Sequence, residues 1–250
     1  MQILILSDIH GNVSALNSVL KDVEKRYKPD TTIILGDNID YGMRSNEIVQ
    51  ILEKFPYPIC CSIWGNHEKA IMEQDYTKFS SDRGRKSAKF TRSNLSESSI
   101  NYLNFKLNKL GKMEINIENK RILAVHGSIE EVFWESIVPE EKHIGYEKYD
   151  FVISGHSHRS HVFSEFYYDN NEIMRNLRML NRNHISQKTV FLNPGSVGQP
   201  RNHNPRAQYA IWDTNNGIYL CEVEYEIQYE MSLYTDDIDM FYRERLKYGI

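Results

Sequence analysis

Hydrophobic residues in the first part of the chain occur in short runs, and each run stops at a polar loop. The first run, residues 2–6, reads QILIL and is followed directly by Ser7 and Asp8. Short runs that are apolar throughout are typical of strands buried on both faces. Four further runs follow the same plan: 32–35, 58–63, 121–125 and 151–153. The pattern predicts five buried strands.

Two of the intervals between these runs have helical periodicity. Apolar residues recur every three or four positions over 13–26, and Asn12 stands before them as an N-cap. A second helix is predicted over 46–54. Strands that alternate with helices in this way predict a largely parallel α/β core.

The second half of the chain has a different pattern, with successive apolar segments separated by turn residues. Antiparallel strands are predicted over 162–168, 189–192, 208–213 and 218–228, and a closing helix over 237–248. The polar segment 68–112 suits a helical cap, with Ser96 as an N-cap. We therefore expect a single domain over 1–250, with a C-terminal strand–helix extension over 225–250. The polar insertion 169–188 has no assigned role.

Composition and charge narrow the class of protein. Lys and Arg number 30 against 34 Asp and Glu, a formal net charge of −4, which argues against a dedicated nucleic-acid binder. The three cysteines, an odd number, argue against a disulfide framework and favour the cytoplasm. No apolar run approaches the 18 or so residues of a membrane span, so no membrane partner is expected.

Residues of the types that commonly bind metals, Asp, Asn and His, follow each of the five predicted strands. Isolated Asp or His residues after strands are usually turn formers, but five such loops in order indicate a common site, since strand ends of open α/β sheets carry ligand sites. Carboxylate, amide and imidazole ligands without a thiolate suit Mn, Fe or Zn. The residues are Asp8, His10, Asp37, Asn66, His67, His126, His156 and His158.

The loop motifs resemble those of the calcineurin-like metallophosphoesterase family. They read Asp8-Ile9-His10, Gly36-Asp37-Asn38-Ile39-Asp40, Gly65-Asn66-His67-Glu68, His126-Gly127 and Gly155-His156-Ser157-His158, and the segment 193–201 (NPGSVGQPR) resembles the small bacterial and archaeal phosphodiesterase-like branch. The resemblance implies a four-layer α/β/β/α sandwich: two packed mixed sheets flanked by helices, with a two-metal site at the strand ends.

The resemblance also implies a role for each motif residue. Asp8, His10 and His158 would hold one divalent metal ion, and Asn66, His126 and His156 the other, with Asp37 bridging both. His67 would be a catalytic histidine oriented by Asp40, while Glu68 is interpreted as a supporting residue or a first-turn helix acid. The expected cofactors are two divalent ions among Mn, Fe, Zn, Ni and Co, with manganese favoured.

The expected reaction is hydrolysis of a small phosphoester by in-line attack of a metal-bridging hydroxide. Two candidate substrate contacts are the loop around Asn12, at a helix N-terminus, and the guanidinium of Arg201. Phosphoprotein phosphatases of the family carry arginines where this chain has Tyr41 and Trp64. The missing arginines argue against a phosphoprotein phosphatase and leave a diesterase or a small-molecule phosphatase. A phosphodiester is taken as the first expectation, and the alternatives are a phosphomonoesterase of small molecules or phosphoproteins, a nuclease and a catalytically silent interaction scaffold.

Overall fold

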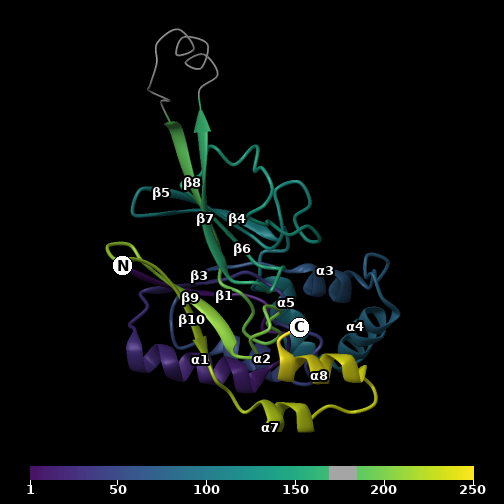
Figure 1. The fold of residues 1–250 in the computed structure, drawn as a ribbon. Helices are drawn as coiled ribbons and strands as arrows, with labels where there is room; N and C mark the ends of the chain where they lie inside the picture. The colour runs from purple at the N-terminus through teal and green to yellow at the C-terminus, as the bar shows by residue number, and fades with distance from the viewer. Residues whose placement is uncertain (169–184) are drawn as a thin grey trace, which may run out of the picture.

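Two five-stranded mixed sheets pack face to face (Figure 1). The computed structural model describes residues 1–168 and 185–250. The first sheet has the order β10-β9-β1-β2-β3, and the second has the order β4-β5-β6-β8-β7. The first sheet contains β1 (Gln2–Leu6), β2 (Thr31–Ile34), β3 (Ile59–Ser62), β9 (Ala207–Asp213) and β10 (Gly217–Val223). The second contains β4 (Lys112–Ile117), β5 (Lys120–Val125), β6 (Phe151–Ser154), β7 (His161–Tyr168) and β8 (Ile185–Asn193).

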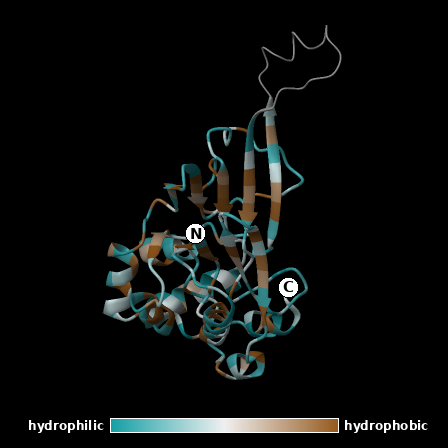
Figure 2. Cartoon of the chain, turned by 90° about the vertical axis from the view of Figure 1, so that its left-hand side faces the viewer, coloured by the Kyte–Doolittle hydropathy of each residue, from teal (hydrophilic) through white to brown (hydrophobic). Residues whose placement is uncertain are grey.

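Strand β1 shows why the apolar runs form buried strands. It pairs in parallel with β2, with Leu4 opposite Thr32, and antiparallel with β9, with Leu4 opposite Ile211. Because side chains alternate along a strand, Ile3 and Ile5 enter the core between the two sheets, while Leu4 and Leu6 enter the core beneath the helices. Both faces of β1 are thus covered, and Figure 2 shows hydrophobic residues concentrated along the strands.

Helices cover the outer face of the first sheet and one end of the molecule. They are α1 (Val13–Arg26), α2 (Ser45–Glu53), α3 (Asn66–Glu73), α4 (Asp82–Asn94), α5 (Glu97–Phe105), α7 (Ile227–Ser232) and α8 (Met240–Tyr248). Asn12 caps α1 by accepting a hydrogen bond from Ala15 N at 3.0 Å, and Ser96 caps α5, both as predicted. The outer face of the second sheet is covered by the segment 127–150, which contains turns and no helix. The two packed mixed sheets are confirmed, with helices over the outer face of the first sheet, while in the described residues the layer over the second sheet is the irregular segment 127–150.

Two sequence predictions about elements are corrected. No strand was predicted between the helical cap over 68–112 and the run at 121–125, but Lys112–Ile117 form the edge strand β4, paired with β5. The strand predicted over 218–228 ends at Val223, and residues 225–250 contain the helices α7 and α8 rather than a strand and a helix. The insertion 169–188 lies largely outside the described residues. Within the described part of the chain, no helix is long and apolar enough to cross a membrane.

A buried ion pair fixes the C-terminal helices to the rest of the molecule. Glu230 of α7 has no exposed surface and pairs with Arg44, and its carboxylate also accepts a hydrogen bond from Ser14 N at 3.2 Å. Through these contacts Glu230 joins α7 to Arg44 and to the first turn of α1.

Replacing Glu230 by alanine should lower the free energy of unfolding by about 3 kcal/mol, because the guanidinium of Arg44 is left poorly compensated. Urea unfolding measures the change. The control is Glu224→Ala, which removes an exposed pair with Arg206 and should cost less than about 1 kcal/mol. Equal losses in the two variants would contradict the role given to Glu230.

Candidate metal centre

The parallel strands bring their polar loops to one edge of the two sheets. β1, β2 and β3 run in parallel in the first sheet, as do β5, β6 and β8 in the second. Their carboxyl ends therefore lie together, and the loop that follows each of them carries residues of the site. The ligand-type residues predicted from the sequence all lie in these loops.

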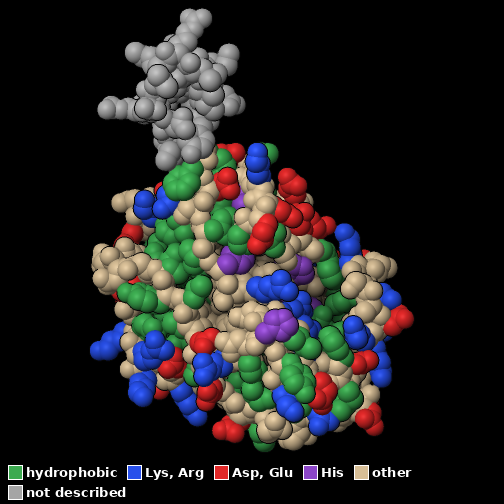
Figure 3. Space-filling model, in the orientation of Figure 1, with side chains coloured by type: hydrophobic (Ala, Val, Ile, Leu, Met, Phe, Trp, Pro, Cys, Tyr) green, Lys and Arg blue, Asp and Glu red, His purple; other side chains and the backbone are tan. Residues whose placement is uncertain are grey.

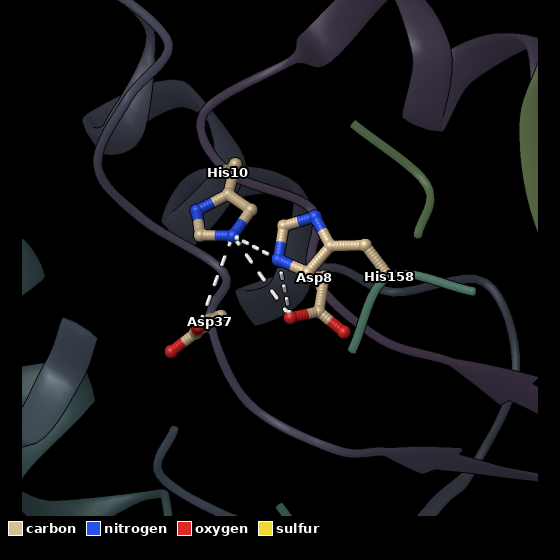
Figure 4. Close-up of side chains that lie close together, drawn as sticks. All are labelled: Asp8, His10, Asp37 and His158. Atoms are coloured by element: carbon tan, nitrogen blue, oxygen red, sulfur yellow. Dashed lines mark hydrogen bonds and ion pairs between the residues drawn. The ribbon is translucent and has the colours of Figure 1, made fainter. Parts of the chain in front are cut away.

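The first group of ligand atoms comes from Asp8, His10, Asp37 and His158 (Figure 4). His158 Nε2 lies 3.1 Å from Asp8 Oδ1 and 3.2 Å from His10 Nε2. His10 Nε2 lies 3.7 Å from Asp37 Oδ2. All four residues are buried.

The second group comes from Asp37, His126 and His156. His126 Nε2 lies 3.3 Å from Asp37 Oδ2 and 2.9 Å from Asn66 Oδ1. Asn66 Oδ1 also lies 3.0 Å from His156 Nδ1. Asp37 belongs to both groups, and the seven ligands expected from the resemblance are brought together in the expected division. His156 is the only partly exposed ligand among them.

The donor chemistry of the first group fits a cation. The Nδ1 atoms of His10 and His158 donate hydrogen bonds to the carbonyl oxygens of Ile39 and Gln199, at 3.2 and 2.6 Å. Burial, reinforced by neighbouring positive charge, lowers the pKa of His158 to about 4 and lowers that of His10 well below its usual value. Their Nε2 lone pairs therefore face each other beside Asp8 Oδ1, which is buried and has no hydrogen-bond partner in the part of the chain that the structure describes. A divalent ion would satisfy all three atoms.

The second group differs because the carboxylate of Asp37 favours a protonated imidazole at His126. His126 Nδ1 donates to Leu35 O at 2.7 Å, which directs Nε2 into the site. Burial alone would lower the pKa of His126, but the carboxylate of Asp37 raises it to about 9. Metal binding at this position would therefore release the Nε2 proton.

Five of the ligands have a backbone conformation that is uncommon for residues other than glycine. Their φ angles are positive: 54° at Asp8, 47° at His10, 52° at Asp37, 64° at His156 and 56° at His158. Such residues cost of order 1 kcal/mol or more each and cluster at functional sites, where the surroundings hold them in place. The strained backbone is thus concentrated in the loops that carry the candidate ligands.

Two glycines allow the loop after β2 and the loop after β3 to approach each other closely. A Cβ atom on Gly36, whose φ is 89°, would lie 2.2 Å from Gly65 N. A Cβ atom on Gly65 would lie 2.1 Å from Asp37 Oδ1. The glycines of the G-D and G-N-H motifs are thus required by the contact between the loops.

Glu68 joins the same two loops. It is fully buried, and its carboxylate accepts hydrogen bonds from Asp37 N at 2.8 Å, Asn38 N at 2.7 Å and Gly65 N at 2.8 Å. These contacts bear out its interpretation as a supporting residue in the first turn of a helix.

Glu68→Ala should lower the free energy of unfolding by about 3 kcal/mol or more, because three buried N–H groups lose their acceptor. Thermal or urea unfolding checks this. Glu73→Ala on the same helix removes only an exposed pair with Lys69 and serves as the control, with an expected loss below about 1 kcal/mol. A Glu68 variant as stable as this control would refute the supporting role.

The loop 193–199 also supports the ligands, and sequence reasoning did not assign this role. Ser196 Oγ donates to Asp8 O at 2.7 Å, and Asn193 Nδ2 donates to Gly155 O at 2.7 Å. Gln199 supplies the carbonyl that orients His158. The loop thus connects the ligand loop after β1 with the ligand loop after β6. The one signal for this role in the sequence was the N-P-G-S motif.

His67 and Asp40 form a buried pair beside the ligands. His67 Nδ1 donates to Asp40 Oδ2 at 2.7 Å, and His67 Nε2 lies 3.9 Å from Asp37 Oδ2. The ring lies between Tyr41 and Phe79, with centroid distances of 4.3 and 5.1 Å. Burial would lower the pKa of His67, but the carboxylates of Asp37 and Asp40 raise it above its usual value.

The two predicted substrate contacts differ in their surroundings. Asn12 is buried, and its side chain is fully engaged, since Oδ1 caps α1 and Nδ2 donates to Gly198 O at 3.0 Å. A substrate contact by the Asn12 side chain is therefore not supported. Arg201 is half-buried, its main-chain N donates to His158 O at 3.2 Å, and its Nε has no hydrogen-bond partner among the described residues. Figure 3 shows Lys or Arg and His side chains gathered in the middle of the face that it displays.

Comparisons with known proteins agree with the geometry. The sequence profile of the calcineurin-like phosphoesterase superfamily domain matches residues 1–217. Protein MJ0912 of Methanocaldococcus jannaschii is 29% identical over 229 residues, which cover 90% of this chain and 88% of that protein.

Two solved structures are similar over nearly their whole length. A metallophosphoesterase from Sphaerobacter thermophilus is 27% identical, with a TM-score of 0.73 and coverage of 100% of this chain and 99% of that one. Protein PH1004 from Pyrococcus horikoshii OT3 is 18% identical, with a TM-score of 0.78 and coverage of 100% and 98%, and supports the fold alone. The chain belongs to the calcineurin-like phosphoesterase superfamily.

Proposed function

We propose that the protein is a phosphoester hydrolase that requires two divalent metal ions and prefers phosphodiesters to monoesters. The observation that carries the proposal is the sharing of Asp37 between two groups of ligand atoms, with the His67–Asp40 pair beside them. A purely structural metal site has no use for a histidine that lies next to the ligands and is oriented by its own carboxylate.

The chain's residues have separate tasks in this reaction. Asp8, His10 and His158 would hold one cation, Asn66, His126 and His156 would hold the other, and Asp37 would contact both. Bound in this way, a pair of divalent cations activates water and neutralises phosphoryl oxygens. His67 keeps Nδ1 on Asp40, which leaves Nε2 directed toward the ligand side for donation of a proton to the leaving ester oxygen.

The surroundings of the site favour a singly charged substrate. Tyr41 packs against His67 and Tyr242, and Trp64 Nε1 donates to Leu103 O at 2.7 Å, so neither position supplies a cation. Arg201 is the guanidinium that we assign to the substrate, and its charge, after burial, is what lowers the pKa of His158. A diester carries one negative charge, whereas a monoester carries up to about two near neutral pH.

The proposal includes the identity of the metal and the cellular compartment. Nitrogen and oxygen ligands without thiolate suit manganese, iron or zinc, and we take manganese as the first choice. The three cysteines are free thiols, which supports a reducing compartment such as the cytoplasm. The proposed partner is a small phosphoester.

The test compares bis-p-nitrophenyl phosphate with p-nitrophenyl phosphate as substrates of manganese-loaded protein, with the metal content of the same sample measured. Faster cleavage of the diester supports the proposal, and cleavage of the monoester alone would indicate a phosphomonoesterase. No cleavage of either ester by protein that holds both metals would favour an interaction scaffold.

A further inference from the structure

Helix α4 presents two hydroxyl groups to the carboxylate of Asp40. Ser87 Oγ donates to Asp40 Oδ1 at 2.6 Å, and Thr91 Oγ1 donates to the same oxygen at 2.8 Å. Ser87 has no exposed surface, and Thr91 is only 4% exposed. Because residues four apart lie on one face of a helix, the two hydroxyls point in the same direction.

The buried face of α4 is unusual for a packing surface. Its buried residues are Gly84, Ser87, Ala88 and Thr91, all small and half of them polar, whereas a helix that only packs against a core usually buries an apolar stripe. The small residues bring α4 close to the site, and the two hydroxyls occupy one oxygen of Asp40. The other oxygen is left for His67 Nδ1.

Asp40 depends on these hydroxyls because it is fully buried. A buried carboxylate needs hydrogen-bond donors for its lone pairs, and here three side chains supply them. With Oδ1 held by both hydroxyls of α4, rotation of the carboxylate is opposed, so Oδ2 stays within hydrogen-bond distance of His67 Nδ1. The ring in turn keeps Nε2 on the ligand side of the site.

We infer that Ser87 and Thr91 are positioning residues, which fix Asp40 and thereby hold His67 in place to protonate the leaving group. The inference rests on the proposed function. It adds that α4 sets the rate at which the protein hydrolyses esters whose leaving group needs a proton. In the step concerned, the oxygen of a water molecule bonds to phosphorus, and the P–O bond to the leaving group breaks with its electron pair on the leaving oxygen. That oxygen takes a proton from His67 Nε2, and a proton from the attacking water replaces it.

Two esters that differ only in leaving group test the inference: methyl p-nitrophenyl phosphate, whose nitrophenolate leaves without a proton, and methyl phenyl phosphate, whose phenolate needs one. In the double variant Ser87→Ala/Thr91→Val, kcat/KM for the phenyl ester should fall by about 10- to 100-fold, because general acid catalysis contributes about 100-fold or more. The nitrophenyl ester should lose less than about 3-fold. Metal content should remain that of the parent protein.

Two single variants separate the hydroxyl from packing. Thr91→Val keeps the shape of the side chain and removes the hydroxyl, whereas Thr91→Ser keeps the hydroxyl and removes a methyl group. We expect the ratio of the two kcat/KM values to change in Thr91→Val and to stay at the parent value in Thr91→Ser. Ser99→Ala, which removes a buried hydroxyl of α5 that bonds to Ser96, is the matched control and should leave the ratio unchanged.

The outcomes distinguish this inference from the proposed function. Equal losses on both esters, or equal effects of Thr91→Val and Thr91→Ser, would show that α4 only supports the structure and would overturn the inference. If the parent protein cleaves both esters and the ratio is unchanged in every variant, the inference fails while the proposed function stands. If the parent with both metals bound cleaves neither ester, both fail.

Discussion

Asp37→Asn should lower the metal content from two ions per chain to one or fewer and reduce phosphoester hydrolysis by about 1000-fold or more. Asp37 is the residue that both ligand groups share, and its Oδ2 lies 3.3 Å from His126 Nε2 and 3.7 Å from His10 Nε2. An amide has one acceptor oxygen and no charge, so it cannot serve both positions as a carboxylate does. A metal ion in such a site contributes several kcal/mol of charge stabilisation, and each 1.36 kcal/mol corresponds to a tenfold change in rate.

Metal analysis of the purified variant and kcat for bis-p-nitrophenyl phosphate measure the two effects together. The control is Asp82→Asn, which makes the same chemical change at an exposed position in the first turn of α4, where Asp82 pairs with Arg85. It should keep both metals and full activity. An Asp37→Asn protein that retains two metals and a tenth of the activity or more would show that Asp37 is not the shared ligand.

The meeting of the candidate ligand residues could be predicted from the sequence by a simple geometric rule, whereas their division between two metal ions came from the family resemblance. Parallel strands end at the same edge of a sheet, so polar residues that follow successive apolar runs meet even when they lie far apart in the chain. Asp8 and His158 contact each other at 3.1 Å although they lie in loops that follow strands of different sheets, β1 and β6. The order of the loops, and not any single histidine, carried the prediction.

The supporting contacts could not be predicted, because they depend on how the loops pass one another. Nothing local in the sequence indicates that Asp8 and Asp37 adopt positive φ angles or that Glu68 accepts hydrogen bonds from the loop of Asp37. The contact of Ser87 with Asp40 joins a helix to a loop 47 residues away. Such contacts arise from packing, which hydrophobic periodicity does not describe.

In the C-terminal segment the sequence predicted a longer strand than the one that forms, because tertiary structure overrides the local pattern. Residues 222–229 alternate between polar and apolar positions and so predicted a strand. The strand ends at Val223, and the helix α7 follows, with Glu230 buried against Arg44. The alternation alone did not decide the structure, because a β preference depends on how the segment packs as well as on its pattern.

His67→Asn should reduce kcat for phosphodiester hydrolysis by about 100- to 10,000-fold while both metals stay bound. His67 belongs to neither group of ligand atoms, so its removal should not open the metal site. Its Nδ1 is held by Asp40 at 2.7 Å, and its ring is fixed between Tyr41 and Phe79, which leaves Nε2 as the only ring atom free to act on a substrate. An asparagine is shorter and cannot donate a proton as an acid. Steady-state kinetics and metal analysis of the same preparation give both quantities.

The comparison of two further variants decides whether the loss reflects chemistry or structure. Asp40→Asn keeps the His67 ring, but it removes the carboxylate that orients the ring and raises its pKa. It should therefore lose less activity than His67→Asn. His203→Asn changes an exposed histidine outside both ligand groups and should leave kcat unchanged. If His67→Asn loses metal in proportion to activity, the residue acts by supporting the neighbouring ligand Asn66. If it keeps both metals and loses kcat with an unchanged KM, the proton of His67 acts in the transition state.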